Sequence, residues 1–441
     1  MISIGGIIGA GLFVGSSASI AAIGPAIVVS YLITGTLILL VMRMLGEMAL
    51  SLPTVHSFAD FPRAALGPWA GFVTGWLYWY FWMIVVPVEA IAGANILHAY
   101  IPLPAGVLGC LLMATMTAVN LMSARSYGEF EFWFSSIKVA AIIAFIVMGA
   151  AYAFGWTSPH GATFANLTSH GGFMPFGAVS VLAGAVTVFF QLTGAEIITV
   201  AAVESAEPAR AVAQLTSSII VRILTFYVGS IFFIVAIVPW NTIEIGKSPF
   251  TRALMQMHFA WAGRAMDFIV LTAVLSCLNS AFYVCSRVLF VLAEHRDAPQ
   301  ALIQLNRRKV PVKSVLLCAL AGVVGILAAI AAPERVFAFL LDGAGALMVF
   351  VYMIVAIAQV RLRRTRERAG SPPPALRMWL FPWASYAAIA GMAAVLVAMA
   401  FTPSLTEELK VSLISLAVAV LAYFILRARR SSPTDARAPA D

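Results

Sequence analysis

The chain is divided into about twelve apolar runs, each long enough to cross a lipid bilayer as a helix. A membrane helix rises 1.5 Å per residue and needs about 20 apolar residues to cross roughly 30 Å of hydrocarbon. The runs lie near Ile2–Ala22, Pro25–Met48, Trp69–Leu97, Leu103–Met122, Phe130–Ala153, Phe176–Val203, Ser217–Trp240, Trp261–Leu292, Val312–Ala332, Val336–Val360, Met378–Phe401 and Leu409–Leu426. The sequence therefore predicts an all-α integral membrane protein.

No soluble domain fits between these runs. The longest connections have room for at most a short helix each and lie near Ala49–Pro68, Phe154–Pro175, Asn241–Ala260 and Ala293–Pro311. Composition agrees, because 62% apolar and 10% charged residues leave too few polar groups to cover soluble domains. We expect one domain over residues 1–430 and a disordered tail rich in Ser, Pro and Ala over residues 431–441.

Basic residues define an orientation in the membrane. With the amino terminus in the cytoplasm, 21 of the 27 Lys and Arg residues fall on the cytoplasmic side. Five fall on the outer side, and Lys138 lies within a span. Short loops rich in Lys and Arg resist translocation, so both termini are predicted to be cytoplasmic. This distribution explains the net charge of +8 without a nucleic-acid partner.

Cysteines, histidines and the amino terminus add few constraints. The four cysteines lie in apolar runs without Cys-x-x-Cys spacing, which favours neither a disulfide frame nor a zinc site. The histidines have no spacing typical of metal ligands, so we expect no metal and no cofactor. Met1 leads directly into the first run, which favours a missing amino-terminal lead.

Two apolar runs contain residues that a continuous helix avoids. Gly5-Gly6-Ile7-Ile8-Gly9-Ala10-Gly11 has four glycines in seven positions, each costing about 1 kcal/mol of helix propensity. Gln191-Leu192-Thr193-Gly194-Ala195-Glu196 places a glycine between polar groups. Such breaks at membrane depth are tolerated where they line a cavity. They lie five spans apart, and because five is odd, the second five-helix unit must have inverted polarity.

Gly5-x-x-x-Gly9 is also compatible with a small-residue helix-packing face. A dinucleotide-binding loop is disfavoured, because no β-strand precedes these glycines and their order is not G-x-G-x-x-G. The second break at the matching position favours a cavity. We therefore expect inverted repeats over about residues 1–153 and 176–360, followed by two extra helices over about 378–428.

Five sequence motifs resemble those of a known transporter family. They are residues 3–15 (Ser3 to Gly15), Met42-Arg43-Met44-Leu45-Gly46-Glu47-Met48, Gly75-Trp76-Leu77-Tyr78-Trp79, residues 127–133 (Tyr127 to Trp133) and Ser276-Cys277-Leu278-Asn279-Ser280. In this order they are similar to the amino acid transporter family of the amino acid/polyamine/organocation superfamily. Within it, the chain resembles bacterial γ-aminobutyrate permeases, from the first span to the basic tail.

The resemblance implies a fold and an activity. The fold would be the LeuT-type bundle with inverted repeats, broken first and sixth helices and two extra helices. The activity would be proton-coupled uptake of a small amino acid across a bacterial inner membrane. His56 departs from the small residue that the family usually has at this position, and the absent amino-terminal lead is a second departure.

An amino acid in mid-membrane needs partners for both its carboxylate and its ammonium group. By resemblance, the amides of Gly9, Ala10 and Gly11 bind the carboxylate, and the carbonyls of Ile7 and Thr193 accept from the ammonium group. The remaining residues assigned to substrate binding are Glu89, Phe190, Gly194, Cys277 and Asn279. Phe190 matches an aromatic residue that closes over the substrate in related transporters, although a Phe here is also compatible with packing alone. An isolated buried cysteine such as Cys277 is also compatible with inert packing.

Four ionisable residues lie within spans, where a charge costs about 2.5–3.5 kcal/mol on insertion scales. They are Glu89, Lys138, Glu196 and Asp342. By resemblance, Lys138 replaces a bound sodium ion, Glu196 couples protons and Glu89 faces the pocket, where we expect it to recognise the substrate amine. We expect Asp342 to take part in gating together with Phe190. Simpler roles are also compatible with these residues: snorkelling to the surface for Lys138, backbone hydrogen bonds that hold the break for Glu196, and helix packing for Asp342.

The main hypothesis is a secondary active transporter that uses alternating access. The chain has no G-x-x-x-x-G-K-[ST] motif for ATP. One rival is a membrane-embedded acyltransferase, suggested by His56-x-x-x-Asp60, whose spacing is one residue short of the usual acyltransferase box. The second rival is an amino-acid sensor, which would usually carry a long soluble terminus. Symport and exchange, and monomer and dimer, are each compatible with the sequence.

Overall fold

The computed structural model describes residues 8–55, 57–122, 125–196, 224–308, 310–331 and 333–430. Every regular element in these ranges is a helix. The long ones are α3 (Ile27–Ser51), α5 (Pro68–His98), α6 (Ala105–Met122), α7 (Arg125–Ala153), α13 (Ala260–Glu294), α14 (Val312–Ala331), α15 (Pro333–Arg368), α16 (Trp383–Ala400) and α17 (Thr406–Arg430). The prediction of an all-helical protein is therefore confirmed for the described part of the chain.

Nine helices in the described ranges are long and apolar enough to span a membrane. Two further apolar segments are shorter, at Gly177–Leu192 and Leu224–Ile237. The first of them stops at the second break, and the next begins where the described range resumes. The nine spans do not establish the expected number of about twelve.

The first predicted break is present in the backbone. Ile8 and Gly9 form a bend, and helical geometry begins at Ala10. The next five residues, Gly11–Gly15, form a π-helical turn (η1) that leads into α2 (Ser16–Ile23). A π turn is wider than an α turn and is common where backbone groups serve a site. A short 3₁₀ helix, η2 (Gly24–Ala26), then connects α2 to α3.

The second predicted break is also present. Two short helices, α8 (Gly177–Ala183) and α9 (Ala185–Leu192), lead to an extended Thr193 with φ −67° and ψ 147°. Gly194 follows with φ +112°, a conformation that residues with a Cβ rarely adopt. The run is therefore interrupted at the glycine because its backbone must turn there.

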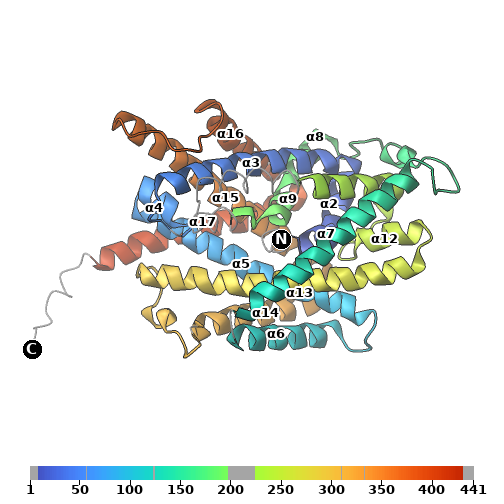
Figure 1. Ribbon diagram of the computed structural model, residues 1–441, viewed down its shortest axis with the longest axis horizontal. Coiled ribbons are helices and arrows are strands. Elements are labelled where there is room, and N and C mark those ends of the chain that lie inside the picture. The colour runs from blue at the N-terminus through green and yellow to red at the C-terminus, as the bar shows by residue number, and fades with distance from the viewer. Residues whose placement is uncertain are drawn as a thin grey trace, which may run out of the picture.

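The longer connections contain only short helices, as expected. They are α4 (Asp60–Leu66), η3 (Phe164–Leu167), η4 (Trp240–Thr242), α12 (Pro249–Gln256) and η5 (Gln300–Ile303); η6 (Pro403–Leu405) precedes α17. Figure 1 shows α4 at one end of the bundle and α12 at the opposite end. We call these the α4 end and the α12 end.

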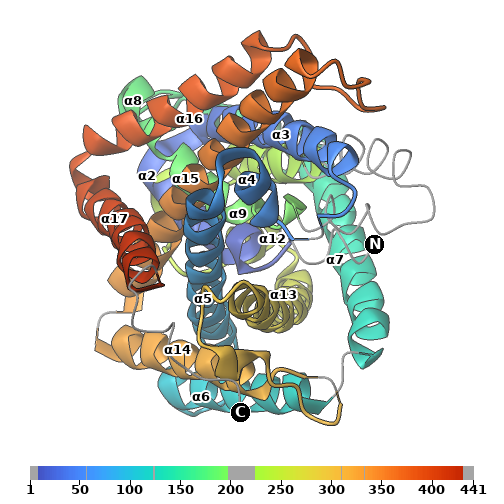
Figure 2. The same ribbon diagram turned by 90° about the vertical axis from the view of Figure 1, so that its left-hand side faces the viewer.

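The long helices surround a core that holds both breaks. α5 packs against α13, α14 and α15, and α9 packs against α3, α15 and η1. In Figure 2, which looks along the bundle from the α4 end, α6 and α14 lie together on one side and α16 lies on the opposite side. The broken segments are thus held between α3, α5, α13 and α15 and away from lipid.

Candidate functional site

A small closed cavity lies between the two breaks. Its volume is about 20 Å³, room for about one water molecule. The lining residues come from the first break, α5, the second break and α13: Gly11, Phe81, Trp82, Val85, Glu89, Phe190, Gln191, Thr193 and Cys277. Five of these nine, Gly11, Glu89, Phe190, Thr193 and Cys277, are among the residues predicted from the sequence. The structure therefore brings half of the ten predicted substrate-binding residues together in a compact, occluded state.

Glu89 accepts a hydrogen bond from a backbone amide that the family resemblance assigned to the substrate carboxylate. The Ala10 N–H donates to both carboxylate oxygens of Glu89, at 3.1 and 3.0 Å. The Cys277 thiol hydrogen-bonds to the same carboxylate. A Cβ on Gly9 would lie 2.6 Å from Cys277 Sγ and 2.7 Å from Glu89 Oε1, so a residue without a side chain is required here. A protein carboxylate thus stands where a ligand carboxylate was expected.

Lys138 does not snorkel to the surface. Its side chain is fully buried, and its Nζ donates to Ser276 Oγ at 2.9 Å. Ser276 precedes Cys277 on α13, and the Lys138 ammonium lies within electrostatic range of Glu89. The ammonium end of the lysine is therefore held near the acid that contacts the first break.

Glu196 ties the second break to two long helices. Its Oε1 accepts from the Tyr78 hydroxyl of α5 at 2.8 Å, and its Oε2 accepts from the Tyr352 hydroxyl of α15 at 2.9 Å. The Gly194 N–H, freed by the break, donates to Oε2 at 2.9 Å. All three side chains are buried. This Tyr78–Glu196–Tyr352 cluster closes the core on one side of the cavity.

Gln191 cross-links the same region from the last turn of α9. Its side-chain oxygen accepts from the Tyr31 hydroxyl, and its Nε2 donates to Ser19 Oγ at 3.0 Å. Its backbone carbonyl, left without a helical partner by the break, accepts from the Tyr227 hydroxyl at 3.0 Å. A carbonyl released at the break is therefore satisfied by a side chain in the occluded state.

Asn279 and Asp342 are among the predicted site residues that do not line the cavity. Asn279 accepts from the amide of Asn120 on α6 at 2.7 Å. It is two residues from Cys277 on α13, and residues two apart on a helix point to different sides, so both cannot face one small cavity. Asp342 accepts a hydrogen bond from the Thr187 hydroxyl of α9 and is thus tied to the second broken segment.

Among the described residues, Gly194 does not line this cavity. Ile7, whose carbonyl was expected to bind the amine, and His56 lie outside the described residues. Gly194 supplies its N–H to Glu196 rather than lining the cavity. No group of three or more His, Cys, Asp and Glu side chains able to hold a metal occurs in the described ranges.

Several residues of this core were not assigned to the site from the sequence: the lining residues Phe81, Trp82, Val85 and Gln191, and Tyr78 beside Glu196. Trp82 and Val85 precede Glu89 by seven and four residues on α5 and share its helix face. Tyr78 lies one further turn along that face, beside Glu196. Helical spacing from Glu89 is the signal that identifies them within the aromatic run that begins at Trp76.

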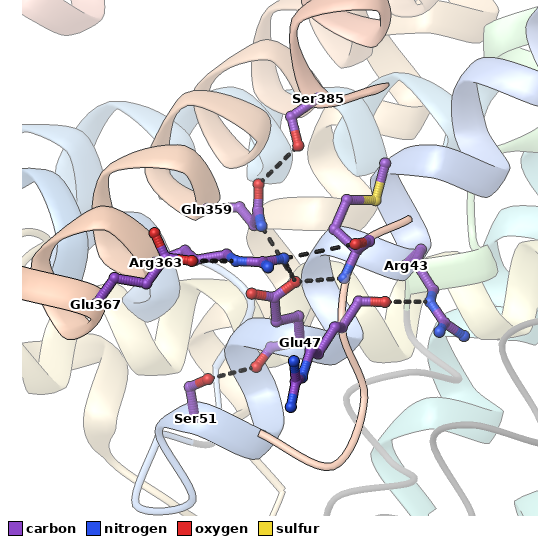
Figure 3. A network of polar contacts seen from close by, with 9 residues as sticks. Arg43, Glu47, Ser51, Gln359, Arg363, Glu367 and Ser385 are labelled. Atoms are coloured by element: carbon purple, nitrogen blue, oxygen red, sulfur yellow. Dashed lines mark hydrogen bonds and ion pairs between the residues drawn. The ribbon is translucent and has the colours of Figure 1, made fainter. Parts of the chain in front are cut away.

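Another buried acid, Glu47, fastens the α15–α16 connection to α3 (Figure 3). Its Oε2 accepts from Gln359 Nε2 at 3.2 Å, Arg363 NH1 at 3.4 Å and the Met378 N–H at 2.5 Å. Ser385 of α16 donates to the Gln359 side chain at 3.0 Å. Glu47 belongs to one of the five sequence motifs, and these contacts give the acid of that motif a structural role.

We expect Glu47→Ala to destabilise the protein strongly. Removing one partner of a buried ion pair costs about 3–5 kcal/mol. In Glu47→Ala the Met378 N–H would lose its acceptor, and Arg363 would keep only Glu367 and the Met378 carbonyl as hydrogen-bond acceptors in the described part of the chain. The matched control is Glu367→Ala, since Glu367 also pairs with Arg363 but is 55% exposed. Thermal unfolding of the purified protein in detergent measures both. Equal shifts for the two variants would show that Glu47 does not fasten this connection.

Comparisons with known proteins identify the family and the relatives of the chain. The sequence model of the amino acid permease family matches residues 1–430. The gamma-aminobutyric acid permease of Bacillus subtilis (strain 168) is 43% identical over 443 residues, covering 100% of this chain and 94% of that protein. The permease of the same name from Escherichia coli (strain K12) is 41% identical over 97% of this chain and 92% of its own length.

A more distant relative and a solved structure also match the chain. The aromatic amino acid transport protein AroP of Corynebacterium glutamicum is 37% identical over 87% of this chain and 84% of its own length. A crystal structure of the Eremococcus coleocola manganese transporter in complex with an aromatic bis-isothiourea substituted compound superposes with a TM-score of 0.59 over 98% of this chain and 94% of that one, at 12% identity. That likeness shows the fold alone.

The fold and its broken helices define a multi-pass membrane protein with a LeuT-like bundle. The chain belongs to the amino acid permease family. Its relatives are permeases, which move solutes across membranes and do not transform them. The family resemblance predicted from the five motifs is confirmed.

Proposed function

We propose that the protein imports γ-aminobutyrate or a similar small amino acid together with a proton. The observation that carries this proposal is the contact of Glu89 with the Ala10 amide in a cavity bounded by both breaks. The permeases of Bacillus subtilis and Escherichia coli, named for gamma-aminobutyric acid, support the substrate class.

The occluded geometry suggests how a zwitterion enters the central cavity. The Ala10 N–H already holds a carboxylate, that of Glu89, so an entering carboxylate can replace it on the same amide. The released Glu89 can then accept from the substrate ammonium group. This exchange gives the substrate carboxylate a donor in the Ala10 N–H and the substrate ammonium group an acceptor in Glu89. Neither charge of the substrate is then buried without a partner.

Access requires the cavity to enlarge, because about 20 Å³ is too small for an amino acid. Phe190 lines the cavity and packs on Phe81, with ring centroids 5.8 Å apart. Next to this pair, Tyr78 packs on Trp82 with ring centroids 6.2 Å apart, and the Tyr78–Glu196–Tyr352 cluster must also open for passage. We assign gating to these two layers, with Asp342 linking α15 to the α9 segment that carries Phe190.

Lys138 is the proposed proton-binding residue. Deprotonation would remove the cation near Glu89, so the charge in the core depends on whether Lys138 carries its proton. Burial disfavours an isolated ammonium ion, which makes such a switch physically accessible. The α4 end, with its Arg-rich loops, faces the cytoplasm in this proposal, and the membrane is the bacterial inner membrane.

We expect Lys138→Ala to abolish accumulation driven by a proton gradient. The test is uptake of labelled amino acids into proteoliposomes with an imposed pH gradient, with and without sodium. Lys410→Ala is the control, because Lys410 is exposed and pairs only locally with Glu407 at 2.7 Å. Uptake that depends on sodium would show that the proton is not the coupling ion. Unchanged accumulation by Lys138→Ala would show that Lys138 does not take part in coupling.

A further inference from the structure

The α12 end carries a second cavity, far larger than the central one. Its volume is about 600 Å³, and it lies between the end of α5, the segment leading into α12, α13 and the π turn of the first break. We call it the vestibule. Its charged or titratable lining residues are His98, Glu244, Lys247, Arg252 and Asp267, and Val14 lies at the first break. None of them was assigned a binding role from the sequence.

One wall of the vestibule has an excess of positive charge. Glu244 Oε2 pairs with Lys247 Nζ at 2.5 Å, and the hydrogen bond from Lys247 together with the charge of Arg252 lowers the pKa of Glu244. Among the described residues, the Arg252 guanidinium makes no hydrogen bond or ion pair. A guanidinium has five donors that suit a carboxylate. Arg252 is therefore available to an anionic group.

The acidic group of the vestibule is held in a fixed orientation. Asp267 Oδ1 accepts from the Thr251 hydroxyl at 2.6 Å, and Oδ2 accepts from the Tyr100 hydroxyl at 2.7 Å. Both donors are neutral, so the negative charge is not compensated by them, and each oxygen keeps a further lone pair. The nearby buried Ser248 hydroxyl, also in the lining, has no hydrogen-bond partner in the described part of the chain.

The vestibule lies next to the central cavity. Phe250 of α12 packs on Phe13 of the π turn and on Phe145 of α7, with ring centroids 5.0 and 4.8 Å apart. The Gly246 N–H donates to Ser17 Oγ of α2 at 3.0 Å. The wall of the vestibule is thus attached to the first broken helix, whose π turn supplies Val14 to the vestibule and Gly11 to the central cavity.

We propose that the vestibule is an outer binding site for zwitterionic amino acids, in which Arg252 binds the carboxylate and Asp267 the ammonium group. With Lys247 and Glu244 paired, one cation and one anion remain, which matches a zwitterion and neither a simple anion nor a simple cation. This inference rests on the proposed import of amino acids. Substrate arriving at the α12 end would bind here before it reaches the central cavity.

The test is the concentration dependence of γ-aminobutyrate transport measured separately from each face in proteoliposomes. Loss of a charged hydrogen-bond partner is worth about a tenfold change or more in affinity. Arg252→Gln and Asp267→Asn should therefore raise the half-saturation concentration for entry from the α12 end about tenfold, at an unchanged maximal rate. Arg252→Lys should give a smaller shift, because it keeps the charge but not the fork of donors.

The controls separate a binding role from a structural one. Lys410→Gln removes an exposed cation of α17 that pairs with Glu407 and does not line the vestibule, and it should leave half-saturation unchanged. Counterflow from the α4 end should have wild-type half-saturation in all variants. The vestibular site would be overturned if Arg252→Gln and Asp267→Asn left the half-saturation concentration for entry from the α12 end unchanged. It would also be overturned if they raised half-saturation equally from both faces. Absence of transport by the unaltered protein would instead remove the proposed function.

Discussion

Gly345→Ala is expected to abolish transport and to prevent stable folding, whereas Gly343→Ala is tolerated. A Cβ on Gly345 would lie 2.0 Å from the Val186 carbonyl oxygen and 2.8 Å from its carbonyl carbon. These are backbone atoms of α9, so relief requires α15 and α9 to separate, and the second broken segment would move with them. Overpacking against side chains alone already costs about 1–3 kcal/mol.

Gly343 is a matched control two residues away on the same helix. A Cβ there would meet no atom within 4 Å. Replacing a glycine by alanine inside a helix gains about 1 kcal/mol of propensity, so Gly343→Ala should be neutral or slightly stabilising. Expression, thermal unfolding in detergent and uptake of labelled amino acid measure both variants. Wild-type uptake by Gly345→Ala would contradict the close packing of α15 on α9.

Glu196→Ala is expected to have the second large effect. It would leave the Gly194 N–H and the hydroxyls of Tyr78 and Tyr352 without their acceptor in the core. Each buried polar group left unsatisfied costs about 1–3 kcal/mol, and water cannot easily replace the acid at this depth. We therefore expect a strongly lowered unfolding temperature and no uptake.

Glu196→Gln separates a structural role from proton coupling. The amide oxygen can still accept, so the break should stay closed and the protein should remain folded. If Glu196 carries the coupled proton, Glu196→Gln should retain exchange of labelled for unlabelled substrate but lose accumulation driven by a pH gradient. Tyr78→Phe, which removes one of the three donors, is the milder control. If Glu196→Gln accumulated substrate fully in response to the pH gradient, Glu196 would have a structural role and no role in proton coupling.

Much of the fold follows from patterns that are local in the sequence. The long apolar runs predicted the helices of the described part, because chain length and bilayer thickness fix the size of a span. The glycines near Gly9 and Gly194 predicted the breaks, since each marks a position that a continuous helix avoids. The short helices in the connections followed from the limited number of residues available there.

The roles of individual site residues depended on contacts between distant segments. Glu89 was expected to bind a substrate amine, but it accepts a hydrogen bond from the Ala10 N–H, 79 residues away in the sequence. Asn279 was grouped with Cys277, yet it pairs with Asn120 on a peripheral helix. Which side of α13 faces the cavity depends on how that helix is rotated against α5 and α6. The motif from Ser276 to Ser280 does not encode that rotation by itself.

The sequence by itself determined that this protein spans a membrane, that two of its helices are interrupted and that it belongs with amino acid permeases. These properties come from hydrophobicity, backbone propensity and motif order, which each short segment carries alone. Only the tertiary structure decided which acid meets which amide, how the core is closed around Glu196 and that charges from three segments meet in the vestibule. Such contacts arise from the packing of helices far apart in the chain, and packing is a property of the whole bundle.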